Sequence, residues 1–151
     1  MALKPPLDPM ALAFAEAHAA LSRGEVPVGA VILRDGAILG RAGNRTLLDR
    51  DPTAHAEILA IRQASLMQSS ERLSGCDLYV TLEPCAMCTA AISFARLRRL
   101  YFAAFDQKGG AVENGPRFFN QRTCHHAPEV YGGIREGEAA DLLKRFFTAR
   151  R

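Results

Sequence analysis

Two cysteines three residues apart, Cys85 and Cys88, are the residues of this sequence best suited to chemistry. They lie in the segment Leu-Glu-Pro-Cys-Ala-Met-Cys, directly after a short run of strand-forming residues. Two thiols at this spacing can bind a metal ion, form a redox disulfide or fill an apolar core. If a helix begins near Pro84, both side chains lie on one face of its first turn, where free N–H groups stabilise thiolates. This position suits Zn²⁺.

The best third zinc ligand is His55, which lies at the first turn of another predicted helix that also follows a strand and a loop. Two such helices can bring their N-termini together at the carboxyl ends of the strands, where α/β folds place their sites. Glu57 lies on a different face of that helix, so it can stand beside the metal without binding it. Two thiolates and one imidazole leave a fourth position open, which is typical of a catalytic zinc.

A structural zinc site would need four protein ligands, and the sequence has no second Cys-x-x-Cys or His-x-x-x-His pair. Cys76, at a turn into a strand, is expected to be a small buried hydrophobe. The cluster Cys124-His125-His126 is a rival site, but consecutive side chains point apart, so loop packing or substrate contact is expected there instead. The combined pattern His-x-Glu with Pro-Cys-x-x-Cys is far more specific than its parts.

The elements that must position these residues alternate between helix and strand. This order indicates an α/β fold in which helices cover both faces of a sheet, and the whole chain, 1–151, is expected to form one domain. The predicted helices span about 9–21, 53–65 and 84–95, and a last helix begins at about 136 and ends the chain. Its inward residues are predicted to be Leu142, Leu143, Phe146 and Phe147. The predicted strands span 28–33, 37–43, 77–82, 99–104 and 130–134, with an irregular segment at 106–128.

Composition allows several function classes and excludes few. The 151 residues suit a chain with a full core, and the first ten residues contain no apolar stretch typical of a secretory signal. The longest apolar run, 28–33, is too short for a bilayer. A cytoplasmic location is expected, where thiols stay reduced. The net charge is +3, with 16 arginines against 3 lysines. Arginine suits phosphates and bases, although a GC-rich genome explains the same bias.

Several segments together resemble the zinc-dependent cytidine and adenosine deaminase superfamily. Thr-Ala-His-Ala-Glu-Ile (53–58) and Glu-Pro-Cys-Ala-Met-Cys (83–88) carry this likeness. Residues 24–31, 43–44, 78–88, 91–100 and 146–151 resemble one branch, the bacterial tRNA-specific adenosine deaminases. The similarity runs from about Met10 to Arg151. It implies a three-layer α-β-α cytidine-deaminase-like fold with a mixed five-stranded sheet.

The resemblance implies that His55, Cys85 and Cys88 hold one Zn²⁺, with a water molecule in the fourth position. Glu57 would carry protons between that water and adenine. The implied reaction converts adenosine to inosine at position 34, the wobble position, of a tRNA, which is expected to be an arginine tRNA. The implied partners are the tRNA anticodon stem-loop and a second copy of the chain in a homodimer, without a membrane.

The resemblance also implies substrate contacts by nine residues. Val28 and Leu82 would flank the base, and Asn44 would hydrogen-bond it. Ala56 and Pro84 would enclose the base, and Asp106 would contact the ribose. The basic residues that would approach the anticodon arm are Lys108, Arg150 and Arg151. The sequence departs from the family pattern at His125 and in the segment 109–119.

Two alternatives stay open at this point. The same zinc chemistry could act on a free base or nucleoside, such as cytosine, cytidine or guanine, and the mild net charge suits this alternative. A zinc-stabilised RNA-binding module without catalysis is the other. Glu57 disfavours it, because a structural zinc has no need of a free carboxylate beside it.

Overall fold

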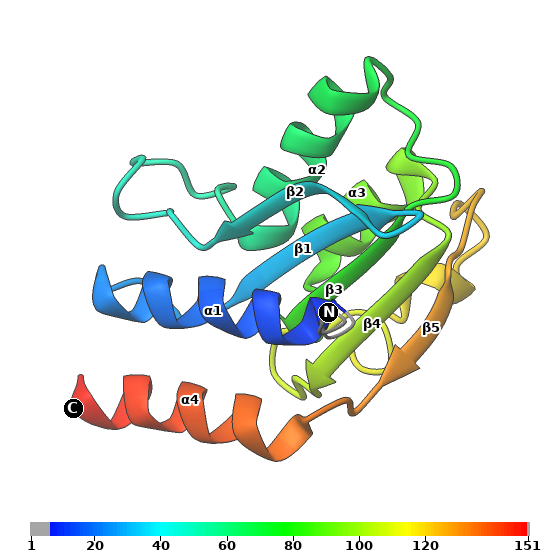
Figure 1. The fold of residues 1–151 in the computed structure, drawn as a ribbon. Coiled ribbons are helices and arrows are strands. Elements are labelled where there is room, and N and C mark those ends of the chain that lie inside the picture. Colours follow the sequence, from blue (N-terminus) through cyan, green and yellow to red (C-terminus); the bar gives the residue numbers. More distant parts are fainter. Residues whose placement is uncertain (1–6, 151) are drawn as a thin grey trace.

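The protein folds into a five-stranded sheet with helices on both faces (Figure 1). This computed structural model describes residues 7–150. The helices are α1 (Pro9–Ser22), α2 (Ala56–Gln68), α3 (Ala86–Ala95) and α4 (Glu136–Ala149), with a short 3-10 helix η1 (Phe118–Asn120). The strands are β1 (Gly29–Arg34), β2 (Ala37–Gly43), β3 (Asp77–Leu82), β4 (Arg99–Ala104) and β5 (Glu129–Gly132).

The sheet is mixed, with the strand order β2-β1-β3-β4-β5. β1 runs antiparallel to β2 and β3, whereas β3, β4 and β5 run parallel to one another. The predicted three-layer α-β-α fold with a mixed five-stranded sheet is therefore confirmed. Because β3 and β4 are parallel, the segments that follow them, including the start of α3, begin at the same edge of the sheet.

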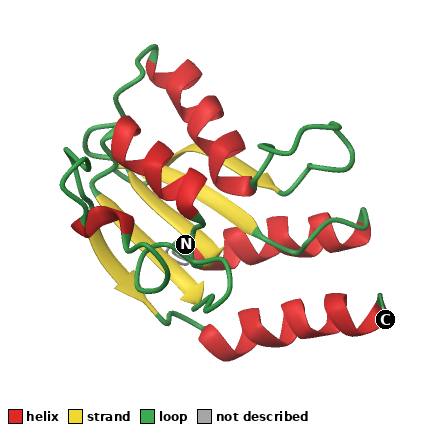
Figure 2. Cartoon of the chain, turned by 180° about the vertical axis from the view of Figure 1, so that it is seen from behind, coloured by secondary structure: helices red, strands yellow, loops and turns green. Residues whose placement is uncertain are grey.

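Alternating strand residues build a separate core on each face of the sheet. On one face, Ile32 and Phe102 pack in a cluster with residues of α2 and α3. On the other, Val31 and Ala103 pack with residues of α1 and α4. Figures 1 and 2, seen from opposite sides, show these two helix pairs on opposite faces.

Two glycines let helix backbones pack directly against the strands. A Cβ atom at Gly29 in β1 would lie 1.9 Å from the backbone oxygen of Ala13 in α1. A Cβ atom at Gly40 in β2 would lie 2.4 Å from the backbone oxygen of Ala60 in α2. Only glycine fits at such contacts, so these positions fix how closely α1 and α2 approach the sheet.

The helices that carry the candidate ligands begin later than predicted. α2 was expected from about residue 53 but begins at Ala56, because the Asp51 carboxylate accepts hydrogen bonds from the Thr53 backbone and hydroxyl and forms a turn instead. α3 was expected from Pro84 but begins at Ala86. The ligand residues just before these helices therefore have extended rather than helical backbones.

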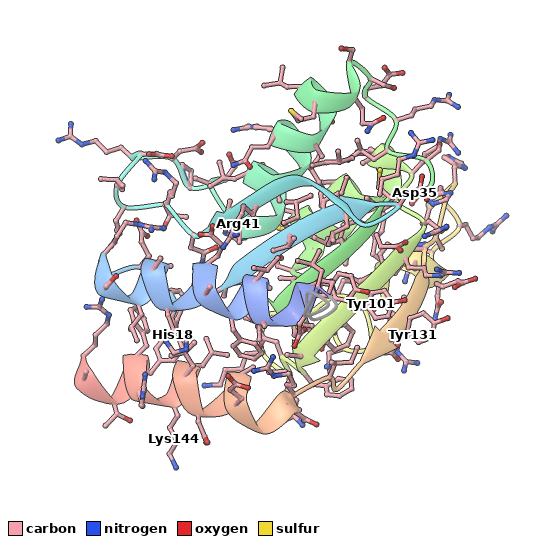
Figure 3. All side chains as sticks on the ribbon, in the orientation of Figure 1. His18, Asp35, Arg41, Tyr101, Tyr131 and Lys144 are labelled. Atoms are coloured by element: carbon pink, nitrogen blue, oxygen red, sulfur yellow. The ribbon has the colours of Figure 1, made fainter. Side chains whose placement is uncertain are left out.

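Stacked tyrosines join the three parallel strands on the face covered by α1 and α4. The ring centroids of Tyr79 and Tyr101 lie 4.3 Å apart, and those of Tyr101 and Tyr131 lie 5.0 Å apart. Figure 3 labels Tyr101 and Tyr131 on the neighbouring strands β4 and β5. Stacking of this kind contributes about 0.5 to 1.5 kcal/mol per pair beyond the buried area. The stacking energy adds to the backbone hydrogen bonds that pair β3, β4 and β5.

α4 is amphipathic, as the sequence indicates. Leu142 and Phe146 are buried, and Lys144 points away from the body of the molecule (Figure 3). Phe147 was predicted to face inward, but it is 55% exposed. Within residues 7–150, no helix has both the length and the apolar character that a membrane crossing requires.

We expect Gly29→Ala to lower the free energy of unfolding by about 2 to 3 kcal/mol, because the added methyl group would overlap the backbone of α1. Gly137→Ala, in the exposed first turn of α4 where nothing lies within 4 Å of the added atom, should raise it by about 0.8 kcal/mol. Urea denaturation of both variants measures the difference. Equal stabilities for the two variants would contradict the close contact.

Candidate functional site

Three metal-binding side chains from two helix starts converge at one point. The His55 Nδ1 atom lies 3.6 Å from the Cys85 sulfur and 3.5 Å from the Cys88 sulfur. The three donor atoms all lie within 4.8 Å of one another, and no other group of this kind occurs among the described residues. The structure thus brings together the three ligands predicted from the sequence.

The helix starts explain this convergence. His55 is the N-cap residue of α2, with φ −74° and ψ 151°, and Cys85 is the N-cap residue of α3, with φ −75° and ψ 176°. Neither side chain caps its own helix by a hydrogen bond, so both are free to turn toward the shared point. Cys88 follows one turn into α3 and is fully buried.

The donor set fits a zinc ion. Tetrahedral Zn²⁺ with bonds of about 2.1 Å to nitrogen and about 2.3 Å to sulfur places those donors about 3.6 Å apart. The nitrogen–sulfur separations of 3.5 and 3.6 Å match this value. With two thiolates and one imidazole, the set supplies three ligands, the number found in catalytic zinc sites.

Hydrogen bonds inside the cluster favour the thiolate form of Cys85, whereas the hydrogen bond that the Cys88 thiol makes to Cys85 raises the pKa of Cys88. The Cys88 thiol and the His55 ring hydrogen-bond the Cys85 sulfur and lower the Cys85 pKa to about 4, although burial acts against it. The hydrogen bond to Cys85 also raises the pKa of His55. A thiolate is the form that binds a metal.

Glu57 is a buried carboxyl group beside the cluster. It lies in the first turn of α2, is 4% exposed, and shares electrostatic interactions with both Cys85 and His55. Burial raises its pKa to about 7, and the nearby Cys85 thiolate acts in the same direction. Such a group can take up and release protons near neutral pH, which is what a general acid and base must do.

A second part of the site is the chain of contacts around Asn44. The Asn44 Oδ1 atom accepts a hydrogen bond of 2.8 Å from the backbone N–H of Ala56, and the Asn44 N–H donates to the carbonyl of Val28. The structure therefore brings these three predicted substrate-binding residues together at the start of α2. Because the Asn44 side-chain oxygen accepts from the helix backbone, the side-chain amide nitrogen is the group of Asn44 that could donate a hydrogen bond to a ligand.

A cavity of about 710 Å³ lies at the carboxyl ends of β3 and β4. Leu82, Asp106 and Lys108, all predicted to contact the substrate, line it. Phe147 lines it as well, and its exposure on this side explains why the inward prediction was wrong. Pro84 is buried, and its carbonyl accepts a hydrogen bond from Ala111 in the segment that follows β4.

Of the two terminal arginines predicted to contact the RNA, the structure describes only Arg150. The Arg150 guanidinium donates a 2.6 Å hydrogen bond to the Gly24 carbonyl and lies 4.0 Å from the centroid of the Phe146 ring. It thus ties the end of α4 to the turn between α1 and β1. Arg151 lies outside the described residues.

Two residues of the rival cluster Cys124-His125-His126 hold a loop in place. The Cys124 thiol donates to the carbonyl of His126, and a ring nitrogen of His126 lies 2.8 Å from the carbonyl of Leu97. His125 is exposed. Loop packing, one of the two roles expected from the sequence, is confirmed.

Sequence reasoning missed two buried carboxylates, Glu25 and Glu83. Glu25 accepts hydrogen bonds from the Thr46 hydroxyl and from the N–H groups of Leu47 and Leu48. Burial opposes ionisation of Glu25, but these bonds lower its pKa below the ordinary value of 4.5. A glutamate between an apolar strand end and a proline, as at position 83, was the signal available in the sequence.

Comparisons with known proteins agree with this geometry. A family model of the cytidine and deoxycytidylate deaminase zinc-binding region matches residues 7–104. The chain belongs to this family. It is 60% identical over 142 residues to a tRNA-specific adenosine deaminase of Agrobacterium fabrum, covering 94% of this chain and 93% of the relative.

Solved structures of other deaminases are similar as well. One from work on A-to-I editing by tRNA:A34 deaminases is 61% identical, with a TM-score of 0.88, and covers 89% of this chain and 98% of that chain. The guanine deaminase of Bacillus subtilis is 30% identical, with a TM-score of 0.63, and covers 94% of this chain and 91% of that chain. The predicted likeness to the tRNA-specific branch of the deaminase family is confirmed.

We expect the purified deaminase to contain about one zinc ion per chain, measurable by metal analysis. Cys85→Ala should reduce this content to near zero and lower the melting temperature, because metal binding and folding are coupled. Cys124→Ala changes another half-buried cysteine outside the cluster and should keep the zinc. Full zinc content in Cys85→Ala would refute the ligand assignment.

Proposed function

We propose that this chain is a zinc-dependent hydrolase that converts adenosine to inosine at the wobble position, position 34, of a tRNA, and that the tRNA is an arginine tRNA. The observation that carries the proposal is the meeting of His55, Cys85 and Cys88 beside the buried Glu57 carboxyl group. The relatives named tRNA-specific adenosine deaminase, which match nearly the whole chain, support this substrate.

The chain's own residues divide the work as follows. His55, Cys85 and Cys88 hold the zinc, which when bound lowers the pKa of a water molecule. Glu57 takes a proton from the attacking water and gives it to N1 of adenine. The water oxygen bonds to C6 of the base, and Glu57 takes the remaining proton from this oxygen and gives it to the C6 amine. The bond between C6 and the amine breaks, so that adenosine and water become inosine and ammonia. The burial of Glu57 excludes bulk water from these transfers.

The remaining predicted residues would form the substrate site. In this proposal the base lies against Val28, Asn44 and Ala56, which hydrogen bonds join at the start of α2. The Asn44 side-chain amide nitrogen donates a hydrogen bond to the base. Leu82 and Pro84 enclose the base from the end of β3. Support comes from the contacts among these residues and from their position beside the zinc ligands.

The anticodon stem-loop would occupy the cavity at the ends of β3 and β4. Its wall combines an acidic, a basic and an aromatic side chain, Asp106, Lys108 and Phe147, a set suited to ribose, phosphate and base. An unpaired loop base is cheap to extract into such a site. Arg150 and Arg151 would approach the arm from the end of α4.

The proposal also covers the assembly, domain and location. The whole chain, 1–151, would act as one deaminase domain in the cytoplasm, where its tRNA substrate is found. A homodimer is supported by an apolar groove between α2 and α3 whose lining includes Ile61, Leu66 and Phe94. Leu66 and Phe94 are 81% and 76% exposed, and a second copy of the chain would cover them.

We expect the zinc-loaded protein to convert adenosine 34 of an arginine tRNA transcript to inosine. Glu57→Gln should keep the zinc and the fold but lower the rate at least about 100-fold, because the amide cannot carry the protons. Inosine detection in the transcript and metal analysis measure both. A transcript left unchanged by the wild type would refute the proposed substrate, and equal rates for the two proteins would refute the role of Glu57.

Two other outcomes of the same experiment would favour the alternatives. Ammonia release from free guanine, cytosine or cytidine, with no inosine in the tRNA, would indicate a nucleobase deaminase, as the likeness to the guanine deaminase allows. Tight tRNA binding without any ammonia would indicate a binding module.

We expect Phe94→Asp to convert a dimeric wild type into a monomer in sedimentation experiments, because the charge would be buried in the α2–α3 groove. Ile38→Asp, on β2 away from this groove, is the matched control and should leave the dimer intact. A dimeric Phe94→Asp variant would contradict the placement of the interface.

A further inference from the structure

Glu83 is a carboxylate, 2% exposed, that binds a distant segment of the chain. Its Oε2 atom accepts from the backbone N–H groups of Val112, Glu113 and Asn114 at 2.9 to 3.1 Å. Its Oε1 atom accepts from the backbone N–H of Asp106 and the side-chain amide of Asn114, at 3.0 and 2.7 Å. Five donors thus surround one acidic group and satisfy its acceptor sites.

The backbone of the same segment wraps closely around this carboxylate. The N–H of Gly110 donates to the Asp106 carbonyl, and the N–H of Ala111 donates to the Pro84 carbonyl. A Cβ atom at Gly110 would lie 2.6 Å from the Glu83 carboxyl carbon. Residues 106–114 are therefore fixed to the stretch that leads directly into the zinc ligands.

The other side of this segment faces the cavity. The Asp106 Oδ1 atom accepts from the N–H groups of Lys108 and Gly109, which fixes the orientation of the Asp106 side chain. All three residues line the cavity at the ends of β3 and β4. The cavity wall is thus held from behind by Glu83.

We propose that Glu83 is a positioning residue that presents the 106–114 segment to the substrate and ties its placement to the zinc-ligand segment. This inference rests on the proposed function, in which the cavity receives the tRNA. Glu83 is neither one of the zinc donors nor one of the residues that line the cavity. It acts through the backbone of the segment that it holds.

Glu83→Gln is the sharpest test because it keeps the shape and changes one acceptor into a donor. Three backbone donors meet Oε2, so the new amide nitrogen is expected at the Oε1 position. There the Asn114 amide can rotate to accept, but the Asp106 N–H cannot and loses its partner. The variant therefore loosens the segment at Asp106.

With zinc-loaded protein and tRNA transcript, we expect Glu83→Gln to raise KM at least about tenfold. The kcat value should stay within about threefold, because an interaction that holds substrate equally in the ground and transition states affects KM. Zinc content should be unchanged. Hydrogen exchange should show faster exchange of the amides of residues 106–114, while those of β5 stay protected.

Two further variants keep the test decisive. Glu113→Gln changes an exposed carboxylate of the same segment that pairs with Arg117, and it should behave as the wild type. Asn114→Ala removes one of the five hydrogen bonds and should shift KM and exchange in the same direction by less. It also serves if Glu83→Gln does not fold.

The outcomes separate the two proposals. An inactive wild type refutes the proposed function, whereas an active wild type with an unchanged KM in Glu83→Gln refutes the positioning role. Unchanged exchange of residues 106–114 in both Glu83→Gln and Asn114→Ala also refutes it. Loss of zinc with a matching fall in kcat would show that Glu83 only supports the metal site.

Discussion

The meeting of two helix starts is the constraint on which the rest of this structure depends. α2 and α3 follow different strands, yet their N-cap residues, His55 and Cys85, have similar extended backbones and aim at one point. The donor separations of 3.5 and 3.6 Å require both helices to be held firmly against the sheet. Gly40 provides this for α2, because its missing side chain lets the helix backbone touch β2. The core and the metal site are thus parts of one packing arrangement.

Three buried glutamates differ in role because their hydrogen-bond partners differ. Glu25 and Glu83 are saturated by N–H and hydroxyl donors, which lower the pKa of both although burial opposes this. Each holds a loop that lies more than twenty residues away in the sequence. Glu57 has far fewer donors, and burial beside a thiolate raises its pKa to about 7. The same residue type thus serves as an anchor at two positions and, in the proposed mechanism, as a proton carrier at a third.

Much of the fold was predictable because its signals are local. Asp35-Gly36 is a two-residue hairpin signal between two strands, and this hairpin, the continuous apolar run of β1 and the apolar face of α4 all follow from turn residues and hydrophobic patterning. The helix starts were misplaced, since the Asp51 side chain forms a turn that composition alone does not reveal. The exposure of Phe147 was missed for a similar reason. Periodicity places it beside inward residues, but the cavity next to it depends on a segment 40 residues earlier.

The sequence by itself determined the chemistry: two thiols, one imidazole and one carboxyl group in a pattern that only a few kinds of site use. The sequence also predicted that Glu57 would stand beside the metal without binding it, on the argument that the two residues share no helix face. In the structure His55 precedes the helix, so the extended backbone at His55 sets the direction of its side chain instead. Only the tertiary structure decided that Nδ1 is the histidine donor atom and that Cys124 and His126 bind a loop. It alone also revealed that Glu83 holds a segment more than twenty residues away. These features depend on distances between atoms remote in the chain, which strand order and helix packing set and which no local pattern encodes.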